Sequence, residues 1–373
     1  AEVLRSRRYR CRGSSDESAV GRNRLARAGD VMTEIRYGEW GHFESQKDSP
    51  DLYEWQGHRG IVLDEIGEYK VIHCFSCILN HCVPLPSEAW LKQYYQERFF
   101  QQKPDYLTRY IEDENWWHLW HGITLTQATE LLIPVVGERA AFFVLDVGTG
   151  PGLFLDVAKR RGWLGWGLEP AAHEGSVFKE HHRTLGIDTC TCTLREYAED
   201  AHDLGAAHPM APFDMIHAYE VLEHIPQPDV FLEQCYELLK PGGVIAITVP
   251  NDYNSYQMAI CQELKLPHWW VSPPEHLNYF SVKSLQLLMR RSGFNIIDAR
   301  GSYPLERFIL MGENYIGNDD LGRQIHHKRV RYEMEIYKSG LFEFLLEEYR
   351  NNVEHPYSYA IGREVTFIGQ KSQ

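Results

Sequence analysis

The sequence predicts an α/β protein with a doubly wound, mostly parallel seven-stranded sheet. Three observations indicate this class. Short β-branched runs alternate with amphipathic stretches, a glycine-rich turn follows the first run, and a carboxylate follows the second. Strands that are covered by helices on both faces have this continuous apolar character. The predicted strands are residues 142–147, 163–168, 187–192, 213–219, 244–249, 295–299 and 364–368.

The composition narrows the classes of partner. The chain has 373 residues with 38 Lys and Arg against 52 Asp and Glu. Because no apolar run approaches the roughly 18 residues of a membrane span, we expect no membrane insertion. Net negative charge repels phosphate backbones, so nucleic acid is an unlikely partner. We expect a small-molecule substrate, and the composition is compatible with either a monomer or a homodimer.

Residues 1–31 depart from this composition, with eight Arg against four acidic residues and few large apolar side chains. That pattern predicts a disordered basic leader rather than a secretion signal. We expect the natural chain to begin at Met32, which makes the leader upstream or non-native sequence. Eight Cys without a regular framework, and no signal peptide, predict a cytoplasmic protein.

The remaining chain divides into three predicted parts. Residues 32–125 form an amino-terminal module rich in aromatic, His and Cys residues, in which Ser87 is a candidate N-cap. A second helix is predicted to begin near Thr126 and to open the α/β domain, residues 126–303 plus 363–373. Residues 304–362 form a mostly helical insertion before the last strand. This insertion would either cover the active site or form a dimer surface.

Aromatic pairs mark two stretches. The run Trp116-Trp117-x-x-Trp120-His121 has helical spacing and predicts a packed stripe rather than a sugar platform. Trp269 and Trp270 precede the Pro273–His276 segment, which suggests either contact with substrate or a hydrophobic lid.

The glycine turn is the first candidate binding site. Asp146-Val147-Gly148-Thr149-Gly150-Pro151-Gly152 joins a buried strand to a helix, and glycines let a ligand approach the main chain closely. Glu169 lies about 20 residues further on, where a carboxylate can accept both hydroxyls of a ribose. A nicotinamide enzyme would share these two features.

Downstream residues separate the two classes. The segments 213–225 (FDMIHAYEVLEHI) and 238–243 (LLKPGG), together with 145–150 (LDVGTG), resemble class I S-adenosylmethionine-dependent methyltransferases. The resemblance covers about residues 142–299 and implies a Rossmann-like fold whose last strand is antiparallel. It implies that Gly148 and Gly150 contact the methionine part, that Asp146 supports the loop and that Glu169 binds the ribose. The implied cofactor-binding set is Asp146, Gly148, Thr149, Gly150, Gly152, Glu169, Thr193, Leu194 and Tyr219.

A carboxylate–histidine turn is the candidate catalytic site. In a helical turn Glu220, Glu223 and His224 would share one face. His276 follows the fifth strand and would lie beside them at the carboxyl edge of the sheet. This quartet resembles the metal sites of ubiquinone-pathway O-methyltransferases and small-RNA 2′-O-methyltransferases, which implies bound Mg²⁺ or Mn²⁺. The alternative is metal-free chemistry in which His224 and His276 act as base or buttress, with Glu220 as partner.

A second candidate metal site lies upstream. Cys74 and Cys77 form one CxxC pair with flanking histidines, which is half of a tetrahedral zinc site. The segment resembles methyltransferases with an amino-terminal zinc-ribbon-like portion, although these have another CxxC. His42 and His58 are the spaced substitutes here. Free thiols packed in an aromatic module are the alternative.

These features predict a methyltransferase that uses S-adenosylmethionine. The expected reaction is O-methylation of a small hydroxylated molecule such as a sugar, polyol or phenol, with or without a metal. Methylation of carbon or nitrogen on a nucleotide-linked sugar is an alternative. A third hypothesis is a catalytically inactive partner subunit that only binds the cofactor.

Overall fold

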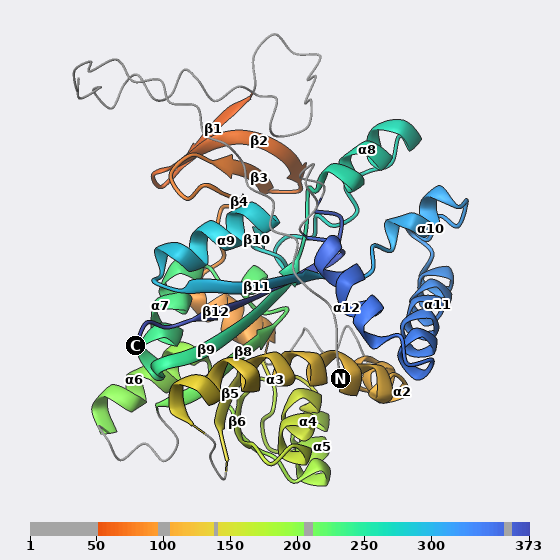
Figure 1. Ribbon diagram of the computed structural model, residues 1–373. Coiled ribbons are helices and arrows are strands. Elements are labelled where there is room, and N and C mark those ends of the chain that lie inside the picture. The colour runs from red at the N-terminus through yellow and green to blue at the C-terminus, as the bar shows by residue number, and fades with distance from the viewer. Residues whose placement is uncertain (1–50, 96–104, 138–140, 205–211, 354–359) are drawn as a thin grey trace, which may run out of the picture. The chain divides into compact units, whose positions relative to one another are not determined.

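The computed structural model describes residues 51–95, 105–137, 141–204, 212–353 and 360–373, which belong to one compact unit. The proposed leader and His42 lie outside these residues. Two sheets organise the described chain (Figure 1), a mostly parallel sheet of seven strands and an antiparallel sheet of five. Among the described residues no helix is long and apolar enough to cross a membrane.

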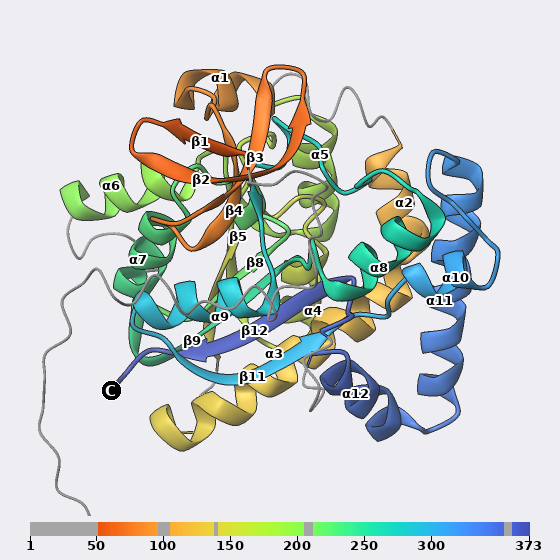
Figure 2. The same ribbon diagram turned by 90° about the horizontal axis from the view of Figure 1, so that it is seen from above.

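The seven-stranded sheet confirms the predicted fold class. Its spatial order is β11 (Asn295–Gly301), β12 (Glu364–Gln370), β9 (Leu239–Pro250), β8 (Phe213–Tyr219), β5 (Phe143–Val147), β6 (Leu164–Leu168) and β7 (Asp188–Cys190). β12 pairs antiparallel with both β9 and β11, and these strands run side by side in Figure 2. The strands from β9 to β7 are parallel. All seven predicted runs are strands, and β9 begins earlier than expected.

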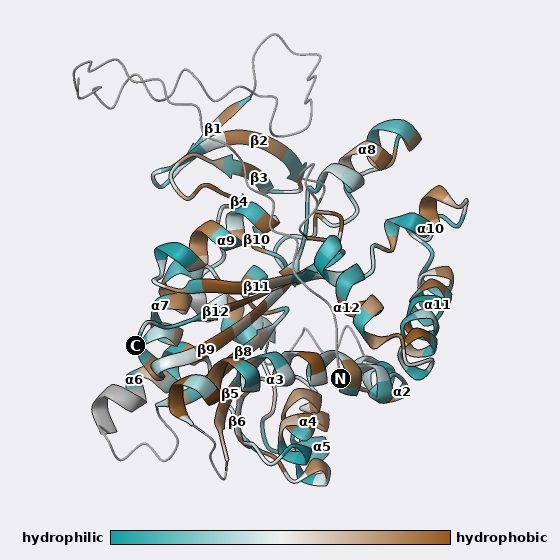
Figure 3. Cartoon of the chain, viewed as in Figure 1, coloured by the Kyte–Doolittle hydropathy of each residue, from teal (hydrophilic) through white to brown (hydrophobic). Residues whose placement is uncertain are grey.

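Helices cover both faces of this sheet because successive strand residues point to opposite sides. Leu145 belongs to a core with residues of α6 (Leu194–Leu204), α7 (Pro228–Leu238) and α9 (Val282–Arg291). Val144 belongs to the opposite core, with residues of α3 (Glu114–Val136) and α4 (Leu153–Arg160). Figure 3 shows this burial as apolar strands between helices of mixed hydropathy. α5 (Val177–Leu185) packs through Phe178 against Ala171 and Ala172.

The five-stranded sheet was not predicted as such. It contains β1 (Leu52–Trp55), β2 (His58–Ile66), β3 (Tyr69–Cys74), β4 (Leu79–Val83) and β10 (Asn278–Tyr279) in that order, all antiparallel. β10 comes from the α/β part of the chain and pairs with β4 through Asn278 opposite His81. Leu79 of β4 also joins the core of the large sheet. The amino-terminal module and the α/β domain therefore share one sheet.

The helices before β5 differ partly from expectation. α1 (Glu88–Gln93) begins after Ser87, whose side chain accepts a hydrogen bond from Trp90 N–H at 3.2 Å, which confirms the predicted N-cap. α2 (Tyr106–Glu112) leads into α3. A helix start near Thr126 was wrong, because α3 begins at Glu114 and its tryptophans supply a buried face. The predicted domain boundary between residues 125 and 126 falls inside this helix.

The predicted insertion is helical where it is described. It contains α10 (Glu306–Leu310), α11 (Asp319–Lys338) and α12 (Phe342–Asn351), and α8 (Ser255–Leu264) precedes it in the chain. α11 packs on α3 through Trp116, whose ring lies 4.5 Å from the guanidinium carbon of Arg329 and whose indole N–H donates to Glu333. Trp116, Trp117 and Trp120 are all buried, as expected of a packed stripe.

Candidate active site

The glycine turn between β5 and α4 has the backbone that a close ligand contact requires. Gly148, Gly150 and Gly152 have φ angles of 70°, 51° and 90°, values that favour glycine over residues with a side chain. A Cβ on Gly148 would lie 2.4 Å from the Val221 side chain. This turn is therefore pressed against the segment that follows β8.

Glu169 fastens the turn to the end of β6. Its Oε2 accepts a hydrogen bond from Gly150 N–H at 2.8 Å, and its Oε1 accepts one from Ala171 N–H at 3.0 Å. Burial raises the pKa of this carboxyl, and the two N–H donors act against that rise. Each carboxylate oxygen can accept a further hydrogen bond, so the side chain keeps the capacity to bind the two hydroxyls of a ribose.

His182 of α5 supports the same turn, and sequence reasoning missed it. Its Nε2–H donates to the Gly150 carbonyl at 2.7 Å, while Nδ1 accepts from the Thr189 hydroxyl at 3.1 Å. A neutral ring can make both contacts, and burial lowers the pKa of His182 to about 4, which keeps the ring neutral. The spacing of α5 gave no signal for this role, because the contact joins residues 32 positions apart.

Asp146 contacts a histidine of the neighbouring strand. Its Oδ1 lies 2.7 Å from His217 Nδ1 on β8, and the His217 ring stacks on Phe154 with centroids 3.7 Å apart. Burial lowers the pKa of His217 to about 3 and raises that of Asp146. Asp146 contacts the glycine turn through its main chain, because Thr149 Oγ1 donates a hydrogen bond to the Asp146 carbonyl at 2.9 Å.

A pocket opens above the glycine turn. About 370 Å³ of it, part of which is open to solvent, is free of protein atoms. Five of the predicted cofactor residues line it: Asp146, Gly148, Thr149, Gly150 and Tyr219. The rest of the wall comes mostly from α2, α3 and α4 and was not predicted: Tyr106, Tyr110, Trp117, His121, Pro151, Leu153, Phe154 and His217.

The other predicted cofactor residues lie outside this lining. Gly152 packs against His182 and Ile187. Leu194 is buried in the core at the start of α6, and Thr193 bonds to Glu196 through its amide N–H and its hydroxyl. Trp270 is buried with Val71 and Tyr279 beside the small sheet, away from the pocket wall.

The carboxylate–histidine turn follows β8, but its geometry differs from the expected single helical face. Glu220 has a φ of 52°, and its N–H donates to the Thr248 carbonyl at 2.9 Å, which continues the β8–β9 pairing. A 3₁₀ turn over Leu222–His224 begins only after it. Glu223, His224 and His276 bring one ligand atom each within 4.8 Å of one another, and Glu220 is not in this group.

The loop before β10 supplies His276, as predicted from the order of the strands. His224 Nδ1 donates to the Glu275 carbonyl at 2.6 Å, and the His224 and His276 rings lie edge to face with centroids 5.0 Å apart. Leu277 N–H donates to the Glu223 carbonyl at 2.8 Å. The side chain of Asn278 donates to the carbonyls of Leu222 and Ile225 at 3.2 and 2.7 Å. The loop and the turn are thus joined at several points.

The electrostatics connect this turn to the cofactor turn. Glu223 is 1% exposed, and its pKa is raised well above its usual range by burial and then by Glu220. Neither of its carboxylate oxygens accepts a hydrogen bond from a described residue. Tyr106 in the pocket wall has a raised pKa, from burial and from the charges of Glu220, Glu169 and Glu223. The Tyr106 phenol therefore lies within reach of charges from both turns.

The sheet, the glycine turn and the carboxylate at the end of β6 define a class I S-adenosylmethionine-dependent methyltransferase. The chain belongs to the methyltransferase domain family, which it matches over residues 95–299.

Curated relatives share part of the chain. It is 29% identical over 168 residues to the "Ubiquinone biosynthesis O-methyltransferase" of Leptothrix cholodnii, which is 44% of this chain and 69% of that protein. It is 30% identical over 151 residues to the Escherichia coli O7:K1 protein of the same name, covering 39% and 60%. With the mitochondrial protein of that name from Mus musculus it shares 32% over 124 residues, or 31% of each chain. A solved 1,6-didemethyltoxoflavin-N1-methyltransferase from Burkholderia thailandensis aligns with 14% identity and a TM-score of 0.42, over 87% of this chain and 100% of that one.

Proposed function

We propose that this methyltransferase acts on a hydroxyl oxygen of a small molecule, a sugar, polyol or phenol, and that a divalent cation assists the transfer. The observation that carries the proposal is the convergence of Glu223, His224 and His276 beside the cofactor turn. This convergence joins two loops at the carboxyl edge of the parallel strands, where open α/β sheets bind their ligands. The names of the curated relatives, which are O-methyltransferases, support the choice of oxygen.

The residues present fit a divalent cation. A buried carboxylate without a hydrogen-bond donor among the described residues is costly unless a proton or a positive charge neutralises it, and a cation would supply that charge. His224 donates its Nδ1–H to a backbone carbonyl, the arrangement that leaves Nε2 with a lone pair for a metal. One carboxylate and two imidazoles suit Mn²⁺ or Fe²⁺, and water or the nearby Glu220 would complete an oxygen-rich set for Mg²⁺.

The residues of this chain would share the work of the transfer. Glu169 would hold the cofactor through the ribose, and the turn at Gly148 to Gly150 would leave the main chain open to its methionine part. A bound cation would lower the pKa of the acceptor hydroxyl and hold it in place. The methyl group would pass from the sulfonium to the acceptor oxygen, which would leave S-adenosylhomocysteine. With the cation bound, the hydroxyl proton would leave to water. Without it, His224 Nε2 or the His276 ring would accept that proton.

Aromatic walls favour a phenol among the three acceptor classes. The Tyr95 ring lies edge to face with His224 at 5.6 Å, and Tyr110 stacks on Trp117 at 4.6 Å in the pocket wall. Rings placed in this way contact a flat aromatic acceptor over more area than they contact a polyol. A phenol with a second hydroxyl beside the first would offer two oxygens to a cation.

The test is methyl transfer from labelled S-adenosylmethionine to a panel of acceptors: a catechol, a cyclic polyol, a sugar and a primary amine. We expect label on oxygen of the catechol, a loss of at least about tenfold after chelation, and recovery with Mg²⁺, Mn²⁺ or Fe²⁺. Glu223→Gln should lose turnover. The matched control is Glu306→Gln. Glu306 is equally buried, accepts a hydrogen bond from the Gln257 side chain at 3.1 Å and lies outside the carboxylate–histidine turn.

Each part of the proposal has its own contrary result. Label on the amine with none on any hydroxyl would overturn the choice of oxygen. Turnover that is unchanged by chelation and by added cations would overturn the cation while leaving the transfer to oxygen in place. Binding of S-adenosylmethionine without turnover of any acceptor, measured by calorimetry, would favour a binding-only subunit.

A further inference from the structure

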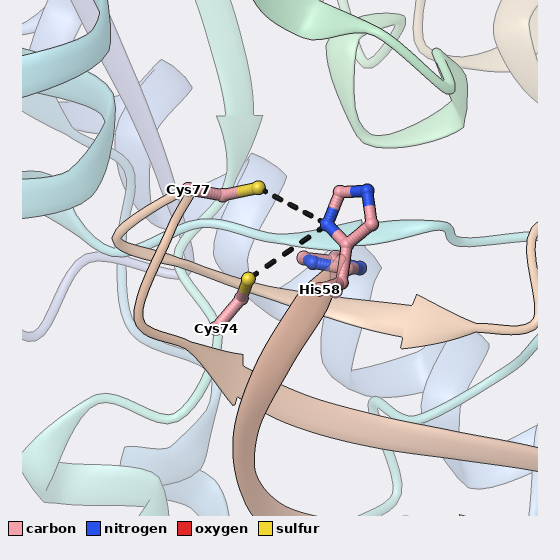
Figure 4. Close-up of side chains that lie close together, drawn as sticks. His58, Cys74 and Cys77 are labelled. Carbon is pink, nitrogen blue, oxygen red and sulfur yellow. Dashed lines mark hydrogen bonds between the residues drawn. The ribbon is translucent and has the colours of Figure 1, made fainter. Parts of the chain in front are cut away.

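A second cluster of metal-ligating side chains lies in the small sheet, on β2, β3 and β4. His58 begins β2, Cys74 ends β3, Cys77 lies in the turn that follows, and His81 lies on β4. The four side chains bring one ligand atom each within 4.8 Å of one another. Figure 4 shows both thiols pointing toward the imidazole of His58, with His58 Nδ1 3.3 Å from Cys77 Sγ and 3.8 Å from Cys74 Sγ.

The buried histidine of this cluster is set for a metal. His81 is 3% exposed, and its Nδ1 donates to the Cys82 carbonyl at 3.0 Å. Its Nε2 therefore carries a lone pair, and this atom has no hydrogen-bond partner among the described residues. A backbone carbonyl on the second nitrogen is the usual support of a metal-binding histidine, because it fixes the ring and the tautomer. An unpaired buried nitrogen is otherwise unfavourable.

The donor set determines the class of metal. Two thiols and two imidazoles from a Cys-x-x-Cys turn and two strands form a closed set of four, which suits tetrahedral zinc and excludes calcium and magnesium, which prefer oxygen. The turn itself is held by Ile78 N–H donating to the Cys74 carbonyl at 2.9 Å. With four protein ligands the set has no open position for a substrate, so the site is structural rather than catalytic.

We propose that His58, Cys74, Cys77 and His81 bind one zinc ion, which fixes the small sheet and through it the loop that carries His276. The connection is short. His81 pairs opposite Asn278 in the register of β4 and β10, and Cys82 N–H donates to the Leu277 carbonyl at 2.8 Å. His276 directly precedes Leu277 and Asn278 in the chain. The proposed zinc binding does not depend on the proposed function, whereas the proposed effect of zinc on turnover does.

The first experiment measures metal content in the full chain purified without chelators. We expect about one zinc per chain by mass spectrometry of the metal, and nearly none in Cys74→Ser/Cys77→Ser. Cys261→Ser, a buried thiol elsewhere, and His73→Ala, a histidine of β3 outside the cluster, are the matched controls and should keep the metal. The variants Glu223→Gln and His276→Ala should keep it too, because they belong to the other site.

The main spectroscopic experiment uses the wild-type protein, so its result does not depend on the folding of a variant. Cobalt exchanged into the wild-type protein should give the intense visible bands of a tetrahedral ion and the ultraviolet charge-transfer band of thiolate ligands. His58→Ala should weaken both. Absence of zinc together with an octahedral cobalt spectrum would overturn the site. So would a disulfide between Cys74 and Cys77, detected when neither thiol reacts with an alkylating reagent in denaturant and chelator until a reductant is added.

The connection to the active site is tested in the Cys74→Ser/Cys77→Ser protein. We expect the dissociation constant of S-adenosylmethionine to stay within about threefold, since the cofactor turn belongs to the other sheet. Turnover should fall between about ten- and a hundredfold, because a small displacement of His276 misplaces the acceptor. Zinc that is present but without effect on turnover would keep the site and overturn the connection. If no acceptor is turned over by the wild type, the metal analysis still decides whether zinc binds.

Discussion

The two sheets of this methyltransferase contribute to the active site in different ways. The parallel sheet supplies the cofactor turn through contacts between neighbours, such as Gly150 with Glu169, 19 residues apart. The small sheet supports His276 through β4 and β10, whose paired residues His81 and Asn278 are nearly 200 positions apart. Cofactor binding and acceptor activation should therefore respond to different substitutions. Each prediction below challenges or refines that separation.

The largest effect is expected from His224→Ala. Its Nδ1–H donates to the Glu275 carbonyl, so the ring joins the His276 loop, and in the proposed function Nε2 either binds the cation or accepts the hydroxyl proton. We expect turnover to fall by about a thousandfold, as is common when a proton acceptor is removed, with little change in cofactor affinity. Rates with a labelled methyl donor and calorimetry with S-adenosylmethionine measure the two quantities. His173→Ala, at an exposed site, is the control; equal losses in both measurements would contradict the separation.

Glu169→Gln should show the opposite behaviour. An amide cannot accept both N–H groups that now bind the carboxylate, and it removes the charge that would accept the ribose hydroxyls. The loss of charge-assisted hydrogen bonds is worth roughly 2 kcal/mol, which weakens cofactor binding about 30-fold. Turnover at saturating cofactor should stay within a fewfold of wild type, with the exposed Glu180→Gln as control. A loss of turnover that saturation does not restore would show that the turn also positions the acceptor.

The sequence predicted the parallel sheet well because its signals are local. Its central strands β5, β8 and β9 are mostly apolar runs, and burial on both faces keeps each run nearly continuous. β1 and β2 of the small sheet are half-exposed, with polar residues such as His58 and Asp64 among the apolar ones of β2. β10 has only two residues, so its pairing with β4 depends on tertiary contacts that no sequence window contains.

The candidate site follows the same division. The glycine turn and Glu169 were recognisable from spacing along one strand–turn–helix unit. No signal in the sequence indicates that Glu220 stands outside the metal-ligating group. The backbone conformation of Glu220 is set by a hydrogen bond to Thr248 on the next strand. Tyr106 and Tyr110 line the pocket from helices before the first strand of the large sheet, and their spacing predicts only a helical face.

Asn278→Ala tests the junction between the two sheets. The wild-type amide donates to two carbonyls of the turn that carries Glu223 and His224, and it is 3% exposed. Losing both hydrogen bonds should cost about 2 kcal/mol of stability and lower turnover about tenfold, with cofactor affinity unchanged. Chemical denaturation and rates measure these effects, with the exposed Asn314→Ala as control. A normal rate in a destabilised protein would mean that the junction supports the fold without positioning the turn.

The smallest effect concerns pH and isolates the cofactor half. His182 is neutral when folded because burial lowers its pKa to about 4, whereas an unfolded histidine titrates near 6.5. Between these values the unfolded state binds more protons, so stability rises with pH through this window and levels off above it. In His182→Gln the side-chain amide can still donate to the Gly150 carbonyl but does not titrate. The drop in unfolding free energy from pH 7.5 to 5.5 should therefore be smaller than in wild type by about 1 kcal/mol. Because His217 and Asp146 titrate in both proteins, the difference between the two curves reports His182 alone; identical curves, with exposed His173→Gln as control, would show that the ring is charged or solvated in the native state.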